Sequence, residues 1–420
     1  MTPPTKRSAG LDHLRALAII LVFLYHYRLF GNPPAIDALG SFGWTGVDLF
    51  FVLSGYLIGG QLLGGIARGN PVSYSEFYFK RFLRIIPAYL AVLVLYFTIP
   101  AFSERSHLPP LWKFLTFTQN LGLDLSATGA FSHAWSLCIE EQFYLVLPLI
   151  LLALTGPAMT NVTGNAAMTS TAADTTIGNA AANTTANAKL AKKGIWLISA
   201  LFILGFAFRI YNWRHFLEPI LQTDGQPGFG AAYYKWIYYP TYTRLDGLLA
   251  GVLLAALFHF RPRLRDRLTR HGNVILLVGL GLITGAWFLC EDLYTFKAAV
   301  FGYPLVSIAY GVIVLAALSP SCVLYRTPSR ITTFIATLSY SLYLVHKQLI
   351  HLTHVALAKA GAMDDNSYLL FWICVGTAFA GGLILHFAIE RPFLRLRDKI
   401  LAKKKPAKEK PAETRSQPVF

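Results

Sequence analysis

Arg15 and His26 are the first pair of residues in this sequence whose types and spacing could support a reaction. Eleven positions separate them. On an α-helix that spacing corresponds to a rise of about 16 Å and a rotation of about 20°, so the two side chains would share one helix face. Asp12 lies three positions before Arg15 and could pair with it. A histidine can act as a general base and an arginine can bind anions. Each residue taken alone has an equally good structural explanation. Arg15 could extend its charged end to the membrane surface, and His26 could be hydrogen-bonded inside a helix bundle.

Carboxylates recur in two later apolar segments. Asp48, in GVDLFFVLSG, lies about one turn inside its segment, close to the expected depth of His26. A carboxylate beside an imidazole orients the ring and stabilises its protonated form, so Asp48 is a candidate catalytic partner of His26. The stretch HAWSLCIEEQFYL adds Ser136, Glu140 and Glu141. Ser136 and Glu140 are i,i+4 neighbours and lie on one helix face, whereas Glu141 is five positions from Ser136 and lies off that face. At most one of the two glutamates therefore shares the Ser136 side of the helix well.

Two further groups of polar residues are candidates for binding. The stretch FYFKRFLRIIPAY holds Lys80, Arg81 and Arg84. These residues fit a phosphate and adenine site, but they also fit the excess of basic residues on the cytoplasmic side of membrane proteins. Polar residues inside apolar segments are costly in lipid and are functional candidates by default. On that basis we expect a substrate to be bound by Trp135, Ser136, Arg244, Asp246 and His346. No H-x-x-x-H or H-E-x-x-H spacing indicates a metal site.

The composition shows what kind of elements must position these residues. Hydrophobic residues make up 55% of the 420 residues and charged residues only 14%, compared with about 25% charged residues in a soluble domain. We therefore expect an all-α polytopic membrane protein with about ten transmembrane helices of about 20 residues each. The apolar stretches lie at 13–30, 44–66, 85–102, 133–155, 194–211, 240–259, 272–290, 297–318, 334–356 and 367–389.

The basic residues predict how these helices are oriented. The chain has 37 Lys and Arg against 21 Asp and Glu, a net charge of +16 that in a soluble protein would suggest nucleic acid. Here the basic clusters lie before the first span and after every even-numbered span, which places all of them on one side. Because basic residues are retained in cytoplasmic loops, both termini are predicted to be cytoplasmic. The expected location is the cell (inner or plasma) membrane, in contact with the lipid bilayer and not with nucleic acid.

The chain is expected to form one transmembrane domain over residues 1–400, followed by a charged cytoplasmic tail at 401–420. Residues 156–190 are rich in Thr, Asn and Ala and contain few large apolar side chains. They are expected to form a disordered cytoplasmic insert, because such a segment cannot bury a core. The four cysteines lie far apart without a C-x-x-C pair, so neither a disulfide framework nor a zinc site is indicated.

Several motifs together resemble the membrane-bound acyltransferase family 3, the O-acyltransferases. In order over residues 11–393 they are LDHLRALAIILVFLYHY, GVDLFFVLSGYLI, FYFKRFLRIIPAY, HAWSLCIEEQFYL, TRLDGLLAG, LSYSLYLVHKQLI and IERPF. The resemblance implies transfer of an acyl group, commonly acetyl, from cytoplasmic acyl-CoA to a hydroxyl on a carbohydrate, lipid or small molecule. Many members also carry a periplasmic hydrolase-like domain after the last span. The short tail here implies a single-chain transferase.

The resemblance also implies roles for individual residues. It implies that Arg15 and His26 are an essential pair, that Arg81 and Arg84 lie on the donor side, and that Glu141 lies in the acceptor region. The chain departs from the family pattern at position 13, where a histidine stands in place of the usual glycine of L-D-G-L-R.

The resulting hypothesis is an O-acyltransferase that uses acyl-CoA, commonly acetyl-CoA, as a donor substrate and holds no tightly bound cofactor. His26 would act as general base on a hydroxyl of a cell-surface carbohydrate, oriented by Asp48 or Glu141. Direct attack on the thioester is preferred, and an acyl-histidine intermediate is the second possibility. The acceptor could instead be a small secreted metabolite such as a macrolide. A secondary transporter is an alternative of a different class, although the chain shows no two corresponding halves.

Overall fold

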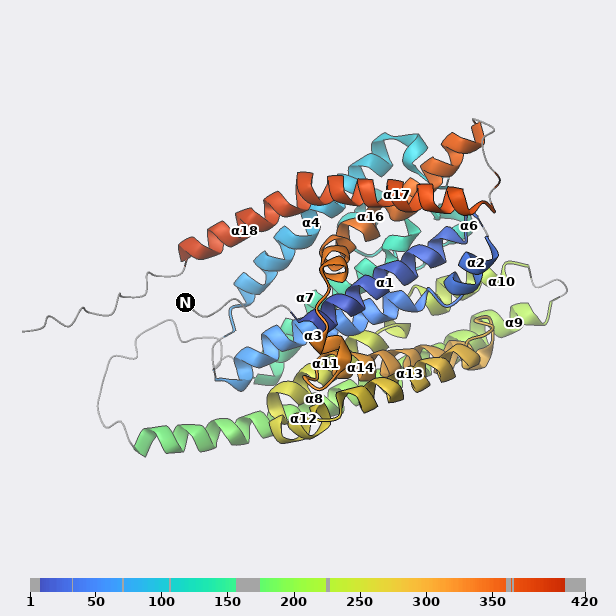
Figure 1. The fold of residues 1–420 in the computed structure, drawn as a ribbon. Helices are drawn as coiled ribbons and strands as arrows, with labels where there is room; N and C mark the ends of the chain where they lie inside the picture. Colours follow the sequence, from blue (N-terminus) through green and yellow to red (C-terminus); the bar gives the residue numbers. More distant parts are fainter. Residues whose placement is uncertain are drawn as a thin grey trace, which may run out of the picture.

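The computed structural model in Figure 1 describes residues 8–31, 33–69, 72–105, 107–155, 174–223, 227–359, 364 and 366–404. Over these residues the chain is helical and contains no β-strand. The longer helices are α1 (Ala9–Tyr27), α3 (Thr45–Ala67), α4 (Tyr74–Thr98), α7 (Trp135–Thr155), α8 (Asp174–Asn212), α11 (Asp246–Phe260), α13 (Gly272–Leu289), α14 (Tyr303–Ala317), α16 (Arg330–Lys359), α17 (Tyr368–Leu385) and α18 (Arg391–Lys404). The all-α prediction is therefore confirmed.

Shorter elements connect the long helices. The α-helical ones are α2 (Pro34–Gly40), α5 (Leu111–Leu115), α6 (Leu125–Thr128), α9 (Glu218–Leu221), α10 (Phe229–Tyr233), α12 (Pro262–Thr269) and α15 (Val323–Arg326). Single 3₁₀ turns lie at Pro100–Phe102, Ser132–Ala134 and Thr241–Thr243. Wider π-helical turns lie at Trp213–Leu217, Tyr234–Tyr238, Ala298–Gly302 and His386–Glu390.

Each of the ten predicted apolar stretches overlaps a helix, but fewer than ten helices qualify as spans by length and hydropathy. In the described part of the chain eight helices qualify, or nine if the bent pair α11 and α12 counts as one span. The stretch 334–356 lies in α16, which has 30 residues and is long enough to cross a bilayer. It is not among the eight because it carries polar residues such as His346, Lys347 and Gln348, which are buried inside the bundle.

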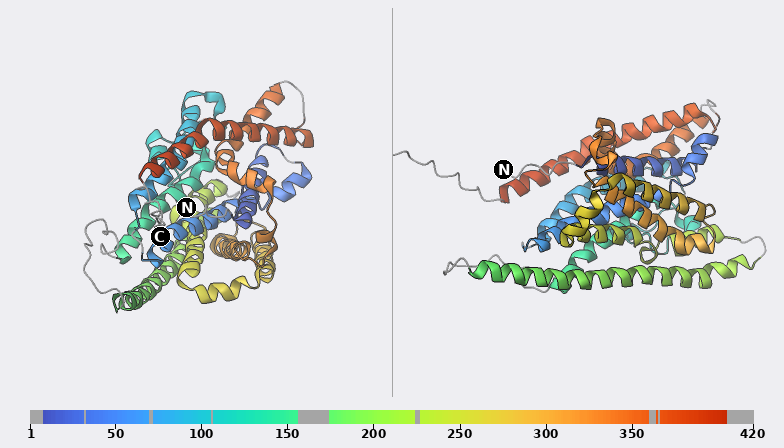
Figure 2. Two further views of the ribbon diagram at one scale, coloured as in Figure 1. Left: turned by 60° about the vertical axis from the view of Figure 1, so that its left-hand side comes forward. Right: turned by 60° about the horizontal axis from the view of Figure 1, so that its bottom comes forward.

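The centre of the bundle is formed by α1 and α3, with α17 and α18 along one side and α8 along the opposite side (Figures 1 and 2). Glycines allow α3 to pack directly against α11. A Cβ atom added to Gly55 would lie 2.2 Å from the carbonyl oxygen of Leu248, and one added to Gly251 would lie 2.2 Å from that of Val52. Small residues permit such backbone contact between membrane helices. This contact fixes the rotation of α3, and therefore the direction in which its polar side chains point.

The predicted insert at 156–190 differs from the structure in its second half. Residues 156–173 lie outside the described residues, but the chain is helical from Asp174 as the first part of α8. The segment contains several alanines between 180 and 188. Alanine has the highest intrinsic helix propensity, so a polar segment that cannot form a core can still extend a neighbouring helix. Of the predicted tail at 401–420, residues 401–404 belong to α18 and the rest lie outside the described residues.

The orientation of the bundle in the membrane remains a prediction that cysteine labelling can test. If the basic loops face the cytoplasm, a cysteine at Asp292, between α13 and α14, should react with an impermeant maleimide from outside. A cysteine at Arg265 in α12 should react only after permeabilisation. The four native cysteines are buried, so they should add little background. Labelling of both positions from the same side would contradict this topology.

Candidate functional site

A polar cavity of about 210 Å³ lies between α1, α3, α4, α7 and α16. Three arginines from two helices line it: Arg15 of α1, and Arg81 and Arg84 of α4. Ser136 and Tyr343 line it as well. Ser136 lies in the first turn of α7, whose N-terminal end is predicted to face outward, whereas Arg15 lies near the start of α1, which is predicted to face inward. The cavity therefore connects a cationic group with hydroxyl groups deeper in the bundle.

The arginines of this cavity came from two separate sequence predictions, and the structure brings them together. Arg15 lies 3.9 Å from Asp12, which confirms the predicted pair, and Asp12 also accepts a hydrogen bond from Thr333 at 3.1 Å. The Arg81 guanidinium lies 5.3 Å from the centre of the Tyr144 ring. Lys80 does not line the cavity. It forms an i,i+4 ion pair with Glu76 at 2.5 Å at the helix surface.

Of the two adjacent glutamates, the structure places Glu140 in the cavity and not Glu141. One carboxylate oxygen of Glu140 accepts a hydrogen bond from Ser54 at 3.0 Å, and the other accepts one from Tyr144 at 2.8 Å. Ser136 and Glu140 both line the cavity, as their i,i+4 spacing predicted. Glu141 is rotated away, and its Oε1 is buried without a hydrogen-bond partner among the described residues.

Three histidine rings form a cluster beyond Tyr343, on the side of the cavity that lies away from the arginines. The ring centres of His26 and His346 lie 4.9 Å apart, and the His133 ring lies 5.9 Å from His26 and 5.4 Å from His346. His26 Nδ1 lies 3.0 Å from the carbonyl oxygen of Val22 and 3.0 Å from His346 Nε2. The three rings come from α1, from the 3₁₀ turn before α7 and from α16, so only the folded bundle assembles them.

The hydrogen bonds of this cluster determine where the protons lie on the neutral rings. His346 Nδ1 faces the carbonyl oxygens of Leu342 at 3.1 Å and Tyr343 at 2.9 Å. A carbonyl oxygen only accepts, so Nδ1 carries the proton and Nε2 of His346 is left as an acceptor. By the same argument His26 Nδ1 donates, to Val22 and to His346. The lone pair of His26 therefore lies on Nε2, where a general base requires it.

Tyr343 lies between the cavity and the histidine cluster. Its hydroxyl is hydrogen-bonded to Ser136 Oγ at 2.6 Å and donates to the carbonyl oxygen of His133. Its ring centre lies 5.8 Å from that of His133 and 6.0 Å from that of His346. The tyrosine contacts both regions, so a molecule that reaches from the arginines to the histidines must pass this side chain. In the described part of the chain, no group of three His, Cys, Asp or Glu side chains is arranged to hold a metal ion.

The predicted pairing of His26 with Asp48 is wrong. Both carboxylate oxygens of Asp48 accept hydrogen bonds from Arg244, at 2.9 and 3.0 Å, and both residues are buried. The Arg244 guanidinium also lies over the ring of Trp135, at 5.2 Å from its centre. The carboxylate of Asp48 is used to neutralise a buried arginine, which outweighs any pairing with an uncharged imidazole.

A second buried ion pair lies close to the first in the chain. Asp246 accepts a hydrogen bond from Arg209 of α8 at 2.6 Å, and both side chains are buried. The residues predicted to bind substrate therefore fall into two groups. Ser136 lines the cavity and His346 belongs to the histidine cluster. Trp135, Arg244 and Asp246 belong instead to the two ion-pair sites.

Removing Asp48 should therefore destabilise the protein more than it impairs chemistry. Asp48→Ala leaves Arg244 buried without its counter-ion, a change that typically costs about 3–5 kcal/mol. We expect a large loss of thermal stability in detergent, and Asp48→Asn should lose less because it still offers one oxygen acceptor. Differential scanning fluorimetry of the purified variants measures this. An Asp48→Asn variant with unchanged stability but strongly reduced turnover would instead support a catalytic role for this carboxylate.

Two residues of this site, His133 and Tyr343, were not assigned a role from the sequence. Both nitrogens of the buried His133 ring lack a hydrogen-bond partner among the described residues. The next residue of α16 after His346, Lys347, donates to Glu104 at 2.9 Å and to Ser132 at 3.2 Å, so a buried ion pair borders the cluster. The sequence feature that could have indicated His133 is its depth in the membrane, because His26 and His133 both lie near the predicted outer ends of apolar stretches. Depth alone does not show which helices are neighbours.

The comparisons with known proteins agree with this architecture. Residues 8–388 match the family described as "Acyltransferase domain". The chain is 28% identical over 368 residues to the peptidoglycan O-acetyltransferase OatA of Listeria monocytogenes, covering 82% of this chain and 49% of that protein. It is 27% identical over 362 residues to the O-acetyltransferase OatA of Staphylococcus aureus, covering 81% of this chain and 50% of that protein.

The chain spans about half the length of these curated relatives. No solved structure shows significant similarity to it. The family match covers nearly all of the described bundle, including every helix that contributes to the cavity and the histidine cluster. This chain is therefore a multi-pass membrane protein that belongs to the acyltransferase-domain family.

Proposed function

We propose that this protein transfers an acyl group, commonly acetyl, from acyl-CoA on the side of the basic loops to a hydroxyl of a cell-surface carbohydrate. The observation that carries the proposal is the arrangement of Arg15, Arg81 and Arg84 in one cavity that Tyr343 also lines. Tyr343 contacts the rings of His133 and His346, and both of these rings contact His26. Arginines recognise phosphates through charge-assisted hydrogen bonds. The relatives named as O-acetyltransferases support a hydroxyl acceptor, and the name peptidoglycan O-acetyltransferase supports a carbohydrate.

The size of the cavity indicates which part of the donor it would hold. Its volume of about 210 Å³ is below the roughly 300–1,000 Å³ of pockets that enclose a drug-sized ligand. This size suits the narrow pantetheine arm of coenzyme A better than the whole molecule. We infer that the three arginines hold the phosphates of the donor, while its nucleotide lies outside the cavity. The pantetheine arm would then direct the thioester past Ser136 and Tyr343 toward His26.

The proposed reaction uses the lone pair on His26 Nε2. This nitrogen takes the proton of the acceptor hydroxyl while the hydroxyl oxygen attacks the thioester carbonyl carbon. The carbon–sulfur bond then breaks, and the leaving thiolate takes up a proton from the imidazolium, so that an ester and free coenzyme A result. Attack by His26 Nε2 itself on the thioester, followed by transfer from an acyl-histidine, has the same overall balance and is the second mechanism.

Purified full-length protein in liposomes tests this function. With labelled acetyl-CoA on the side of the basic loops and a peptidoglycan oligosaccharide on the other, we expect label in the saccharide and release of free coenzyme A in equal amounts. Transport, the alternative from another class, predicts that label crosses the membrane without release of coenzyme A. Label in neither the saccharide nor a small hydroxylated acceptor such as a macrolide would contradict the proposal.

The role of the arginines gives a separate prediction. Each charge-assisted hydrogen bond contributes about 1.5–3 kcal/mol, so the double variant Arg81→Ala/Arg84→Ala, which removes two of them, should raise the KM for acyl-CoA by about a hundredfold or more. Lysine at either position should restore only part of the affinity because bidentate geometry is lost. The matched control is Arg267→Ala/Arg270→Ala, which removes two exposed arginines of the same spacing outside the cavity. Equal KM values for both double variants would mean that Arg81 and Arg84 do not bind the donor and only orient the protein in the membrane.

A further inference from the structure

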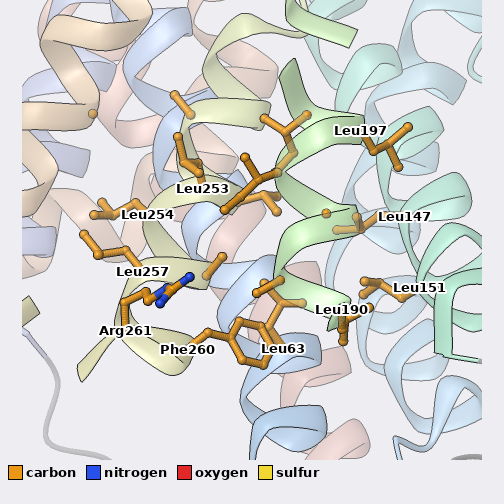
Figure 3. A pocket seen from close by; sticks show the side chains of 18 of the residues that line it. Leu63, Leu147, Leu151, Leu190, Leu197, Leu253, Leu254, Leu257, Phe260 and Arg261 are labelled. Carbon is orange, nitrogen blue, oxygen red and sulfur yellow. The ribbon is translucent and has the colours of Figure 1, made fainter. Parts of the chain in front are cut away.

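A second, larger cavity lies between α8 and the rest of the bundle, where α3, α7, α11 and α14 face it (Figure 3). Its volume is about 520 Å³, and it shares no lining residue with the polar cavity. Leucines such as Leu147, Leu190 and Leu253 form its walls, and all other lining residues but one are apolar or glycine. The exception is Arg261, at the end of α11, whose guanidinium lies beside Phe260 at one end of the cavity in Figure 3.

The length of this groove matches one leaflet of a bilayer. Its lining runs from Ala250 in α11 to Arg261, the residue after the end of that helix, and the eleven steps between them correspond to a rise of about 16 Å. Half of a hydrocarbon core of about 30 Å is about 15 Å. The groove therefore begins near the middle of the membrane and ends at the interface on the side of the basic loops. Its occupant must be apolar along this depth and must fit between helices that are already packed.

A transmembrane helix would need a groove about 10–12 Å wide to accept its side chains. A hydrocarbon chain is much narrower than a helix and can follow an irregular apolar channel. The dimensions and the lining together fit an acyl chain.

The charged residues at the Arg261 end of the groove indicate which head group the lipid carries. Arg261 is exposed. The adjoining helix α12 adds the exposed Arg263, and α8 brings the exposed Lys192 and Lys193 to the same end. Basic residues beside the membrane attract anionic lipids, at about 1 kcal/mol per residue near the surface. An anionic phosphate is therefore favoured at this position over a zwitterionic head.

We propose that the groove between α8 and α11 binds an anionic glycerophospholipid of the leaflet on the side of the basic loops, with one acyl chain in the groove and the phosphate at Arg261. The lipid attaches the long helix α8 to the bundle in its basic-side half. This binding is independent of the proposed transfer reaction, since none of its residues lines the polar cavity.

Two substitutions test the two parts of the site in the full-length protein. Gly194→Leu adds a side chain inside the groove without displacing the backbone, because a Cβ atom there would meet no atom within 4 Å. Gly285→Leu is the matched control, since position 285 on α13 has the same open surroundings and does not line the groove. Arg261→Ala removes the charge and Arg261→Lys retains it.

Native mass spectrometry with phosphatidylglycerol and with phosphatidylcholine of the same acyl chains measures the occupancy. We expect the protein to retain phosphatidylglycerol preferentially, Gly194→Leu to lower its occupancy and Gly285→Leu to leave it unchanged. Arg261→Ala should weaken binding by about tenfold, and Arg261→Lys should restore most of the preference. A phosphatidylglycerol with a photoreactive group in its acyl chain should crosslink to peptides of α8 and α11.

Three outcomes would overturn the proposal. The first is equal retention of the two phospholipids by the unaltered protein. The second is an equal loss of occupancy in Gly194→Leu and Gly285→Leu, which would place the lipid on the outer surface of the bundle. The third is retention of a polyprenyl phosphate with displacement of phosphatidylglycerol, which would assign the groove to a different lipid.

Discussion

Replacing His26 by alanine should lower kcat by ~10²–10⁴-fold, the range typical for loss of a general base. Binding of acyl-CoA should change little, because the arginines that are proposed to hold the donor lie at the other end of the cavity. His26→Gln should not restore turnover, since an amide keeps a hydrogen bond to Val22 but cannot take up a proton. Single-turnover transfer from labelled acetyl-CoA, together with calorimetry of coenzyme A binding, separates the two effects.

His215 provides a matched control for this experiment. Its Nδ1 lies 3.0 Å from the carbonyl oxygen of Tyr211 four residues earlier, the same local hydrogen bond that His26 makes with Val22, but it is exposed and outside the cluster. His215→Ala should therefore retain normal turnover. If His26→Gln kept kcat within about threefold of the unaltered protein, a change of less than about 1 kcal/mol, the imidazole of His26 would serve only as a hydrogen-bond donor in the bundle.

The second large effect is expected at His346, as a positioning residue. His346 Nε2 accepts a hydrogen bond from His26 Nδ1 at 3.0 Å and so keeps the lone pair of His26 on Nε2. His346→Phe preserves the ring volume but removes one of the two acceptors of His26 Nδ1 and leaves only the carbonyl oxygen of Val22. A hydrogen bond of this kind contributes about 0.5–1.5 kcal/mol, so we expect kcat to fall by up to about tenfold with an unchanged KM for acyl-CoA.

A partial rescue distinguishes positioning from packing at this site. His346→Asn supplies a side-chain oxygen that can accept the hydrogen bond from His26, and it should be more active than His346→Phe even though it fills less space. Thermal stability measured in parallel should favour the phenylalanine variant, because phenylalanine packs better in a buried position. If activity followed stability in both variants, His346 would contribute packing alone.

The sequence by itself determined the helical architecture and the approximate depth of the polar residues. Each transmembrane helix can be predicted from one continuous apolar stretch, because a helix satisfies its backbone hydrogen bonds within itself. Pairs within one helix were also predictable, since the helical repeat fixes their geometry. The contact of Arg15 with Asp12 and the shared cavity side of Ser136 and Glu140 are examples. The exception was α8, where alanines extend the helix into a segment expected to be disordered.

Contacts between helices were decided only by the tertiary structure. His26 and Asp48 lie at similar depths on neighbouring helices, yet His26 contacts His346, 320 positions away, and Asp48 contacts Arg244, 196 positions away. Depth follows from the position of a residue along its helix. The neighbour that a side chain meets depends on the rotation of the helix, which is set by how closely the backbones approach.

In this protein the contact of Gly55 and Gly251 with the opposing helix sets that rotation for α3 and α11, which carry Asp48 and Asp246. The position of Glu140 in the cavity, with Glu141 rotated away from it, depends in the same way on how α7 packs against its neighbours. One residue along a helix turns a side chain by about 100°. The sequence therefore predicts which polar residues reach the site only to within one position, and the packing of the bundle selects among them.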